Sequence, residues 1–143
     1  MIYSSAVSIF FVDRDVKLTF DEAELTIFGP IYNGSSNENS LCVLFETENC
    51  AILVTGDRSD FGERMLLRSH DLPDVDLLIA GHHGSKYSTS QELLQAVTPE
   101  TVIISAGADN RYGHPHPELL ERLADFGCIV YRTDLQGTIL YRR

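Results

Sequence analysis

The chain has 143 residues, 43% of them hydrophobic, which suits one domain with a single core and argues against two independent domains. It carries 21 acidic and 11 basic residues, a formal net charge of −10, so its composition lends no support to nucleic acid as a partner. Three widely spaced cysteines without a CxxC pair indicate neither a disulfide framework nor a thiolate zinc site.

Residues 1–56 have the pattern of strands. Segments 7–12, 16–20 and 24–28 alternate or cluster β-branched and aromatic residues between charged turns, which predicts antiparallel strands. A polar loop rich in Asn, Ser and Gly follows at 31–40. Two further strands, 41–47 and 51–55, flank Glu48-Asn49, which has the composition of a hairpin turn.

From residue 57 onward, helices and strands alternate. Asp60, with Glu63 three residues later, predicts the capped start of a helix over 61–69. Thr89 and Glu92 predict a capping box for a second helix that ends at Val97. Apolar runs predict strands at 76–80 and 101–105, between and after these helices. No apolar run approaches the ~18 residues that a membrane span needs, so we expect a soluble chain without direct membrane insertion.

The last part of the chain contains a third helix and two short strands. Pro117 marks the start of this helix and Gly127 its end, and its apolar residues share one face: Leu119, Leu120, Leu123 and Phe126. Strands are predicted at 129–131 and 138–141, around a turn at 134–137. An antiparallel sheet that leads into βαβ units predicts a layered α/β or α+β domain. We expect the following sheet residues to be buried: Leu77, Ile79, Val102, Ile104 and Val130.

Three polar clusters follow predicted strands, at 55–57, 81–85 and 113–117, where α/β folds usually assemble their sites. Because the strands belong to one sheet, we expect Asp57, one of His82 or His83, and the His114 loop to meet at one edge. Asp57 alone is more often a turn residue or a helix cap. Four of the five histidines fall in these clusters, and this concentration favours a functional site.

The histidines allow more than one interpretation. Successive side chains of a strand point in opposite directions, so one of His82 and His83 would face a ligand while the other supports it. The alternative is one surface and one core histidine. His114 and His116 can share one side of an extended loop, and the alternative role of His116 is to cap the helix that Pro117 begins.

The order and spacing of several motifs resemble the C-terminal metallo-β-lactamase-like domain of ComEC-type competence proteins. These motifs are Thr-Gly-Asp at 55–57, Asp-Val-Asp-Leu-Leu at 74–78, His-His-Gly-Ser-Lys at 82–86, Gly-His-Pro-His-Pro at 113–117 and Tyr-Arg-Thr-Asp at 131–134. The Asn-Glu-Asn-Ser segment at 37–40 fits as well. The resemblance implies the C-terminal half of a metallo-β-lactamase αββα sandwich, with residues 1–143 as a single, truncated domain. Residues 1–56 are its strand-rich part, and residues 57–143 are the part in which strands and helices alternate.

This resemblance also implies a function and a set of roles. The family hydrolyses DNA during uptake with divalent metal, zinc or manganese, in a soluble domain attached to a bacterial membrane protein on its extracytoplasmic side. By correspondence, Asp57 is the bridging metal ligand and the His82-His83 pair the late histidine ligand. The remaining roles are catalytic for His114 and His116, and phosphate binding for Ser85, Lys86, Arg111 and Arg132.

The His-x-His-x-Asp-His loop that supplies most metal ligands in the family does not occur in this sequence. We therefore expect the chain alone to bind metal weakly or not at all and to be inactive. A second hypothesis is a non-catalytic folded fragment that self-associates through early-strand residues such as Ile9, Phe11, Leu18, Phe20, Leu25 and Ile27. A third is another hydrolase of the superfamily, such as a lactonase or phosphorylcholine esterase, and the 113–117 motif argues against it.

Overall fold

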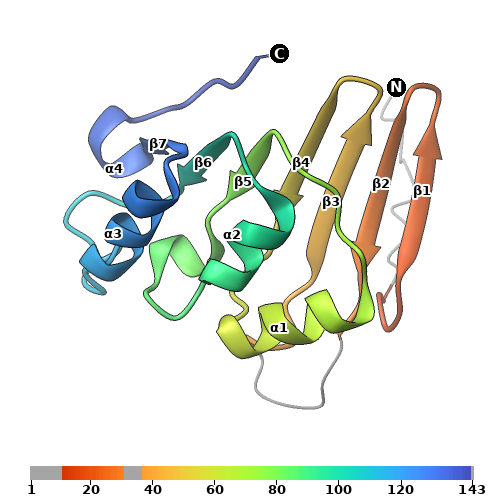
Figure 1. The fold of residues 1–143 in the computed structure, drawn as a ribbon, viewed down its shortest axis with the longest axis horizontal. Coiled ribbons are helices and arrows are strands. Elements are labelled where there is room, and N and C mark those ends of the chain that lie inside the picture. The colour runs from red at the N-terminus through yellow and green to blue at the C-terminus, as the bar shows by residue number, and fades with distance from the viewer. Residues whose placement is uncertain (1–10, 31–36, 143) are drawn as a thin grey trace, which may run out of the picture.

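The computed structural model describes residues 11–30 and 37–142, so most of the strand predicted at 7–12 lies outside the described residues. Within them, seven strands form a single sheet whose spatial order is the chain order (Figure 1). The strands are β1 (Val16–Phe20), β2 (Ala23–Phe28), β3 (Cys42–Thr47), β4 (Cys50–Val54), β5 (Leu77–Ile79), β6 (Thr101–Ile104) and β7 (Ile129–Arg132).

The sheet changes from antiparallel to parallel at β4. Strands β1 to β4 pair antiparallel, and β4 to β7 pair parallel. Thr47 lies opposite Cys50, so Glu48-Asn49 is the two-residue hairpin turn that the sequence predicted. Each parallel connection requires a crossover, which is supplied by α1 (Asp60–Ser69), α2 (Gln91–Val97) and α3 (Pro117–Phe126).

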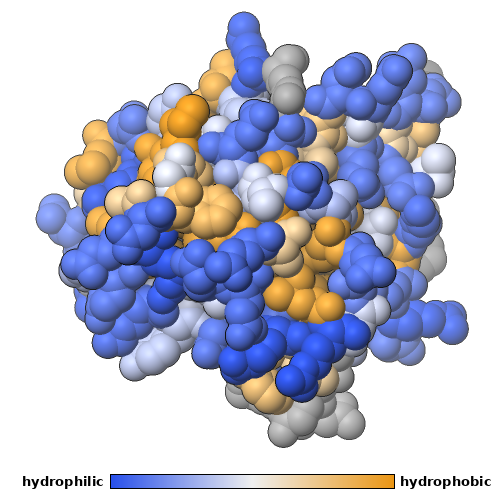
Figure 2. Space-filling model, in the orientation of Figure 1, coloured by the Kyte–Doolittle hydropathy of each residue, from blue (hydrophilic) through white to orange (hydrophobic). Residues whose placement is uncertain are grey.

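These three helices pack on one face of the sheet and form the core with it. The fully buried apolar residues of these helices are Leu66, Leu93, Leu94, Val97, Leu119 and Leu123, and they belong to one cluster with Leu53, Leu78, Val102 and Ile104 of the sheet. Hydrophilic residues predominate on the outside of this helix-covered face (Figure 2). The predicted apolar face of α3 is therefore its contact with the core.

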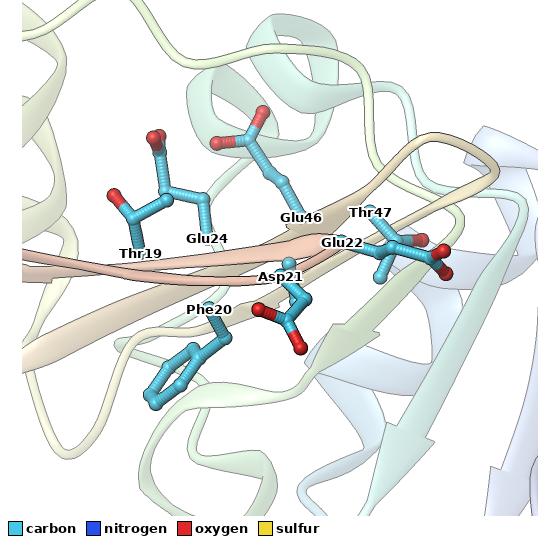
Figure 3. Close-up of a pocket in the computed structure, with 8 residues that line it drawn as sticks. Thr19, Phe20, Asp21, Glu22, Glu24, Glu46 and Thr47 are labelled. Carbon is cyan, nitrogen blue, oxygen red and sulfur yellow. The ribbon is translucent and has the colours of Figure 1, made fainter.

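The opposite face of the sheet is also apolar. Side chains alternate along a strand, and the strand register places one set of apolar residues on this face: Val16, Leu18, Phe20, Leu25, Ile27, Val43, Phe45, Ile52, Val54, Leu77, Ile79, Ile103, Ile129 and Tyr131. At the end of the β1–β2 hairpin, Phe20 lies on one side and Glu24 and Glu46 on the other (Figure 3). The antiparallel strands thus turn their polar residues toward the helix side.

Several sequence predictions need correction at the helix starts. The N-cap of α1 is Ser59, whose Oγ accepts from Phe61 N at 3.2 Å, rather than Asp60. The N-cap of α2 is Ser90, not Thr89, because Thr89 is buried with a left-handed φ of 52° and cannot serve as the extended cap residue. Pro117 and Gly127 bound α3 as predicted.

The C-terminal segment also differs from prediction. Residues Thr133–Gln136 form the short helix α4 where a turn was expected, and the described residues 138–142 form no strand. Leu77, Val102 and Ile104 are buried as predicted, whereas Ile79 and Val130 are only partly buried. Leu77 and Ile79 share the face away from the helices, and Val130 lies in the edge strand β7. Among the described helices, none is long and apolar enough to span a membrane.

Candidate functional site

The three polar clusters meet beyond the carboxyl ends of the parallel strands. Asp57 follows β4, the 3₁₀ helix η1 (Gly81–Gly84) follows β5, and the 113–117 loop leads into α3. The His82 and His114 ring centroids are 5.7 Å apart, and those of His114 and His116 are 4.7 Å apart. The Asp57 carboxylate acts electrostatically on His114. The structure therefore brings the His82, His114 and His116 rings together, with Asp57 near enough to act on the pKa of His114.

Asp57 is positioned by the turn after β4. Its backbone N donates to Ser40 Oγ at 3.2 Å, which links the 37–40 segment to this turn. Gly56 has a φ of +63°, and a Cβ there would lie 2.8 Å from the Ser40 Cβ, so the turn requires glycine. The Gly56 carbonyl accepts from His82 N at 2.9 Å and so connects the turn to η1.

His82 and His83 lie in η1 rather than in a strand. Both have left-handed φ values, 47° and 55°, so the expectation that they alternate across a strand does not apply. The ring of His82 lies beside His114. The His83 Nδ1 instead lies 2.9 Å from the Ser105 carbonyl, to which it donates, and this contact leaves Nε2 available. The two rings therefore have different neighbours: His82 lies beside His114, and His83 is bonded to Ser105.

Close packing around Gly84 joins η1 to the His114 loop. A Cβ on Gly84, whose φ is +90°, would lie 2.7 Å from the Pro115 Cβ. The Gly84 carbonyl accepts from His116 N at 2.9 Å. His116 is the N-cap residue of α3, but its side chain makes no capping bond, and its Nδ1 accepts from Lys86 N at 3.1 Å. The His116 ring therefore orients the loop after η1.

The electrostatics of the cluster favour a neutral His114. Burial lowers the pKa of the His114 imidazole, and the neighbouring His116 and His82 rings lower it further, whereas the Asp57 carboxylate opposes them. A neutral imidazole has one donor and one acceptor nitrogen, so His114 can accept a proton or a hydrogen bond at neutral pH.

The four residues predicted to bind phosphate all make hydrogen bonds or ion pairs within the chain. Lys86 Nζ lies 3.3 Å from Glu118 Oε1, and Arg132 binds both oxygens of Asp134, at 3.0 and 2.5 Å. Arg111 donates to the Tyr112 hydroxyl at 2.6 Å. Ser85 is buried, and its Oγ accepts from Tyr87 N at 3.3 Å. A phosphate role for these four residues stays a prediction.

Two positioning residues were missed by sequence reasoning. The fully buried Glu63 carboxylate accepts from Thr89 N at 2.5 Å and Ser90 N at 2.8 Å. Arg122 donates to the carbonyls of residues 86, 88 and 89 at 3.0 to 3.1 Å. Both side chains hold the segment that joins η1 to α2. For Glu63, the sequence offered one signal of its burial. It lies three residues before the core residue Leu66, and residues at this spacing share one face of a helix.

The described residues do not by themselves fit a metal ion. Within 11–30 and 37–142, no group of three or more His, Cys, Asp or Glu side chains could hold one. A catalytic zinc bound by protein generally has three protein ligands. The family correspondence offers Asp57 and one histidine of the His82-His83 pair, which falls short of that number.

Solved structures define the class of this fold. The chain matches a mutant of the CmlA β-hydroxylase with a TM-score of 0.58 and 14% sequence identity, covering 88% of this chain and 32% of that one. The seven-stranded sheet with its covering helices is therefore a layered α/β fold of the metallo-β-lactamase class, as predicted. No protein-family model matches the chain.

Curated relatives narrow the class to one family. ComE operon protein 3 of Bacillus subtilis (strain 168) is 44% identical over 108 residues, Recombination protein 2 of Haemophilus influenzae 36% over 105, and Competence protein ComA of Neisseria gonorrhoeae 35% over 110. These matches cover 73 to 76% of this chain but only 13 to 16% of the relatives. They confirm the predicted resemblance: the chain is a relative of the ComEC-type competence proteins.

Proposed function

We propose that this chain forms the histidine-bearing part of a site that hydrolyses phosphodiester bonds of DNA during uptake, in a soluble domain on the extracytoplasmic side of a membrane protein. The observation that supports this proposal is the meeting of Asp57, His82, His114 and His116 beyond one edge of the sheet. Sites of α/β folds usually lie at this position. The competence relatives supply the substrate class.

The chain's own residues would orient the phosphodiester and handle protons. The neutral His114 imidazole can accept a proton, and His83 keeps Nε2 available because its Nδ1 is bonded to Ser105. Divalent metal would supply the activated water in the family, and holding it here requires ligands beyond the described residues. We therefore expect the isolated chain to be inactive.

A chimeric protein tests this function. We would replace the matching segment of the Bacillus subtilis relative with this chain and measure DNA uptake and transformation. The chimera should restore both, and Asp57→Ala should reduce transformation by about 10- to 100-fold or more, because even groups that only support metal ligands have effects of about 10- to 100-fold. Asp125→Ala, an exposed carboxylate on α3, is the matched control and should leave transformation unchanged. Full transformation by the Asp57→Ala chimera would contradict the proposal.

The apolar face of the sheet favours a second candidate. A surface of this kind seldom stays exposed on a monomer, so the isolated chain would be a non-catalytic fragment that self-associates through this face. Phe20 and Leu18 on this face are 56% and 41% exposed. Phe11, with a side chain that is 93% exposed, is a further apolar residue of the early segment.

A further inference from the structure

A small hollow lies beside the histidine cluster. It has a volume of about 200 Å³ and is lined by His83, Ala106, Gly107, Asn110, Tyr112 and His114. Pockets for drug-sized ligands usually occupy about 300 to 1,000 Å³. This hollow therefore suits one flat ring system rather than a larger ligand.

Tyr112 is an exposed aromatic side chain in a defined setting. It is 61% exposed, and its ring lies at 25° to that of His114 with the centroids 5.8 Å apart. The Arg111 guanidinium lies 4.8 Å from the Tyr112 ring centroid. Tyrosine and arginine together are the side chains on which unpaired bases stack in proteins that bind single-stranded nucleic acid.

The loop that presents Tyr112 is held by Asn110. Its Nδ2 donates to the carbonyls of Gly107 and His114 at 2.9 and 2.5 Å. Its Oδ1 accepts from the backbone N of Tyr112 and His114 at 3.2 and 3.0 Å. Because these bonds occupy both the amide nitrogen and the amide oxygen of its side chain, Asn110 has little capacity left to form hydrogen bonds with the edge of a base. A base placed in this hollow would therefore be recognised by the face of its ring, with little dependence on base identity.

We propose that this hollow binds one nucleobase of single-stranded DNA by stacking on Tyr112, next to the phosphodiester that faces the histidines. The inference rests on the proposed function and adds a binding subsite to it. Stacking is short-ranged and needs no net positive charge, which is compatible with a chain of net charge −10.

Three substitutions test the hollow without removing a histidine. Tyr112→Ala removes the stacking ring, and Tyr112→Phe retains it. Gly107→Leu fills the hollow instead, and a Cβ at Gly107 would meet no atom within 4 Å, so we expect this variant to fold normally. Equal far-ultraviolet circular dichroism and equal thermal midpoints would establish that all three variants are folded.

The probe is a short labelled oligothymidylate, compared at low salt with an abasic oligonucleotide of equal length and charge. Fluorescence anisotropy should show about tenfold tighter binding of the oligothymidylate, because stacking one base contributes about 1 to 3 kcal/mol. Tyr112→Ala and Gly107→Leu should abolish this preference, and Tyr112→Phe should keep it.

The outcomes separate this inference from the function on which it rests. If both oligonucleotides bind the native chain equally, the base subsite is wrong and the proposed DNA site stands. A preference that survives Tyr112→Ala would also overturn the subsite. If neither oligonucleotide binds at any concentration tested, the proposed function fails for this chain and the inference fails with it.

Discussion

Glu63 shows how far one residue can depart from its sequence pattern. It lies three residues after Asp60, as in a capping box, yet its carboxylate is fully buried and bonded to the backbone of Thr89 and Ser90. Burial raises the pKa of this carboxyl from 4.5 to about 7, against the opposing effect of the Ser90 and Thr89 N–H groups. Thr89 Oγ1 accepts from Gly81 N at 2.9 Å, so Glu63 acts on the start of η1 through one intermediate residue.

A pH dependence of stability follows from this shift. A carboxyl with a raised pKa in the folded chain contributes stability that is present below pH 4.5 and is lost as the pH rises through about 7. The unfolding free energy of the native chain minus that of Glu63→Gln should fall across this window, by up to about 3 kcal/mol. Urea unfolding at several pH values measures it. Glu121→Gln, at an exposed position of α3, is the control, and a constant difference for Glu63→Gln would contradict the assignment.

At the scale of elements, the segment between η1 and α2 depends on two helices that pack on either side of it. Glu63 reaches it from α1 and Arg122 from α3. The segment has little regular structure of its own, so its backbone carbonyls need partners from elsewhere. The placement of His82 and His83 is therefore coupled to the packing of α1 and α3.

Loss of Arg122 should loosen this segment. Arg122→Met keeps much of the stem volume but removes three hydrogen bonds from a charged donor, and we expect a loss of about 2 to 3 kcal/mol in unfolding free energy. Amide hydrogen exchange should accelerate over 81–90. Arg64→Met is the control, because Arg64 pairs with Asp60 at 3.7 Å on the surface and the loss of this pair should cost less than about 0.5 kcal/mol. Unchanged exchange over 81–90 in Arg122→Met would show that Arg122 does not hold the segment.

At the scale of the whole molecule, the sheet has one face that α1, α2 and α3 cover and one apolar face that they leave free. Buried apolar surface contributes about 25 cal/mol per Å², so the exposed residues of this face, Leu18, Phe20, Ile129 and Tyr131, favour association. A symmetric dimer is the simplest closed arrangement, because it uses the same face twice. Ile9, one of the residues predicted to take part, lies outside the described residues.

We predict that the isolated chain is dimeric at tens of micromolar, which multi-angle light scattering measures. Phe20→Glu, which places a charge on the apolar face, should shift the chain toward monomer. Thr19→Glu is the matched control, because Thr19 is the preceding exposed residue of β1 and its side chain points to the other side of the sheet. A native chain that is monomeric and binds no hydrophobic dye would exclude association through this face.

The sequence alone predicted most of the elements from β1 to β7 in their order, and it supplied the candidate site residues, whose roles stay predictions. Local signals were sufficient for the 48–49 hairpin turn and for the Pro117 and Gly127 ends of α3, because these depend on the residues immediately involved. The motifs at 55–57, 82–86 and 113–117 were sufficient for the family, because their order and spacing are specific. Local patterns failed where distant groups compete for the same side chain, as at Thr89 and Glu63.

Only the tertiary structure decided how the site is built. His82 and His83 occupy left-handed conformations that the strand pattern could not predict, because they depend on packing of Gly84 against Pro115, about thirty residues away in sequence. The ion pair of Lys86 with Glu118 and the burial of Glu63 likewise arise from contacts between elements. Periodicity reports which face of an element is apolar, whereas the partner of each polar group is set by the packing of the whole chain.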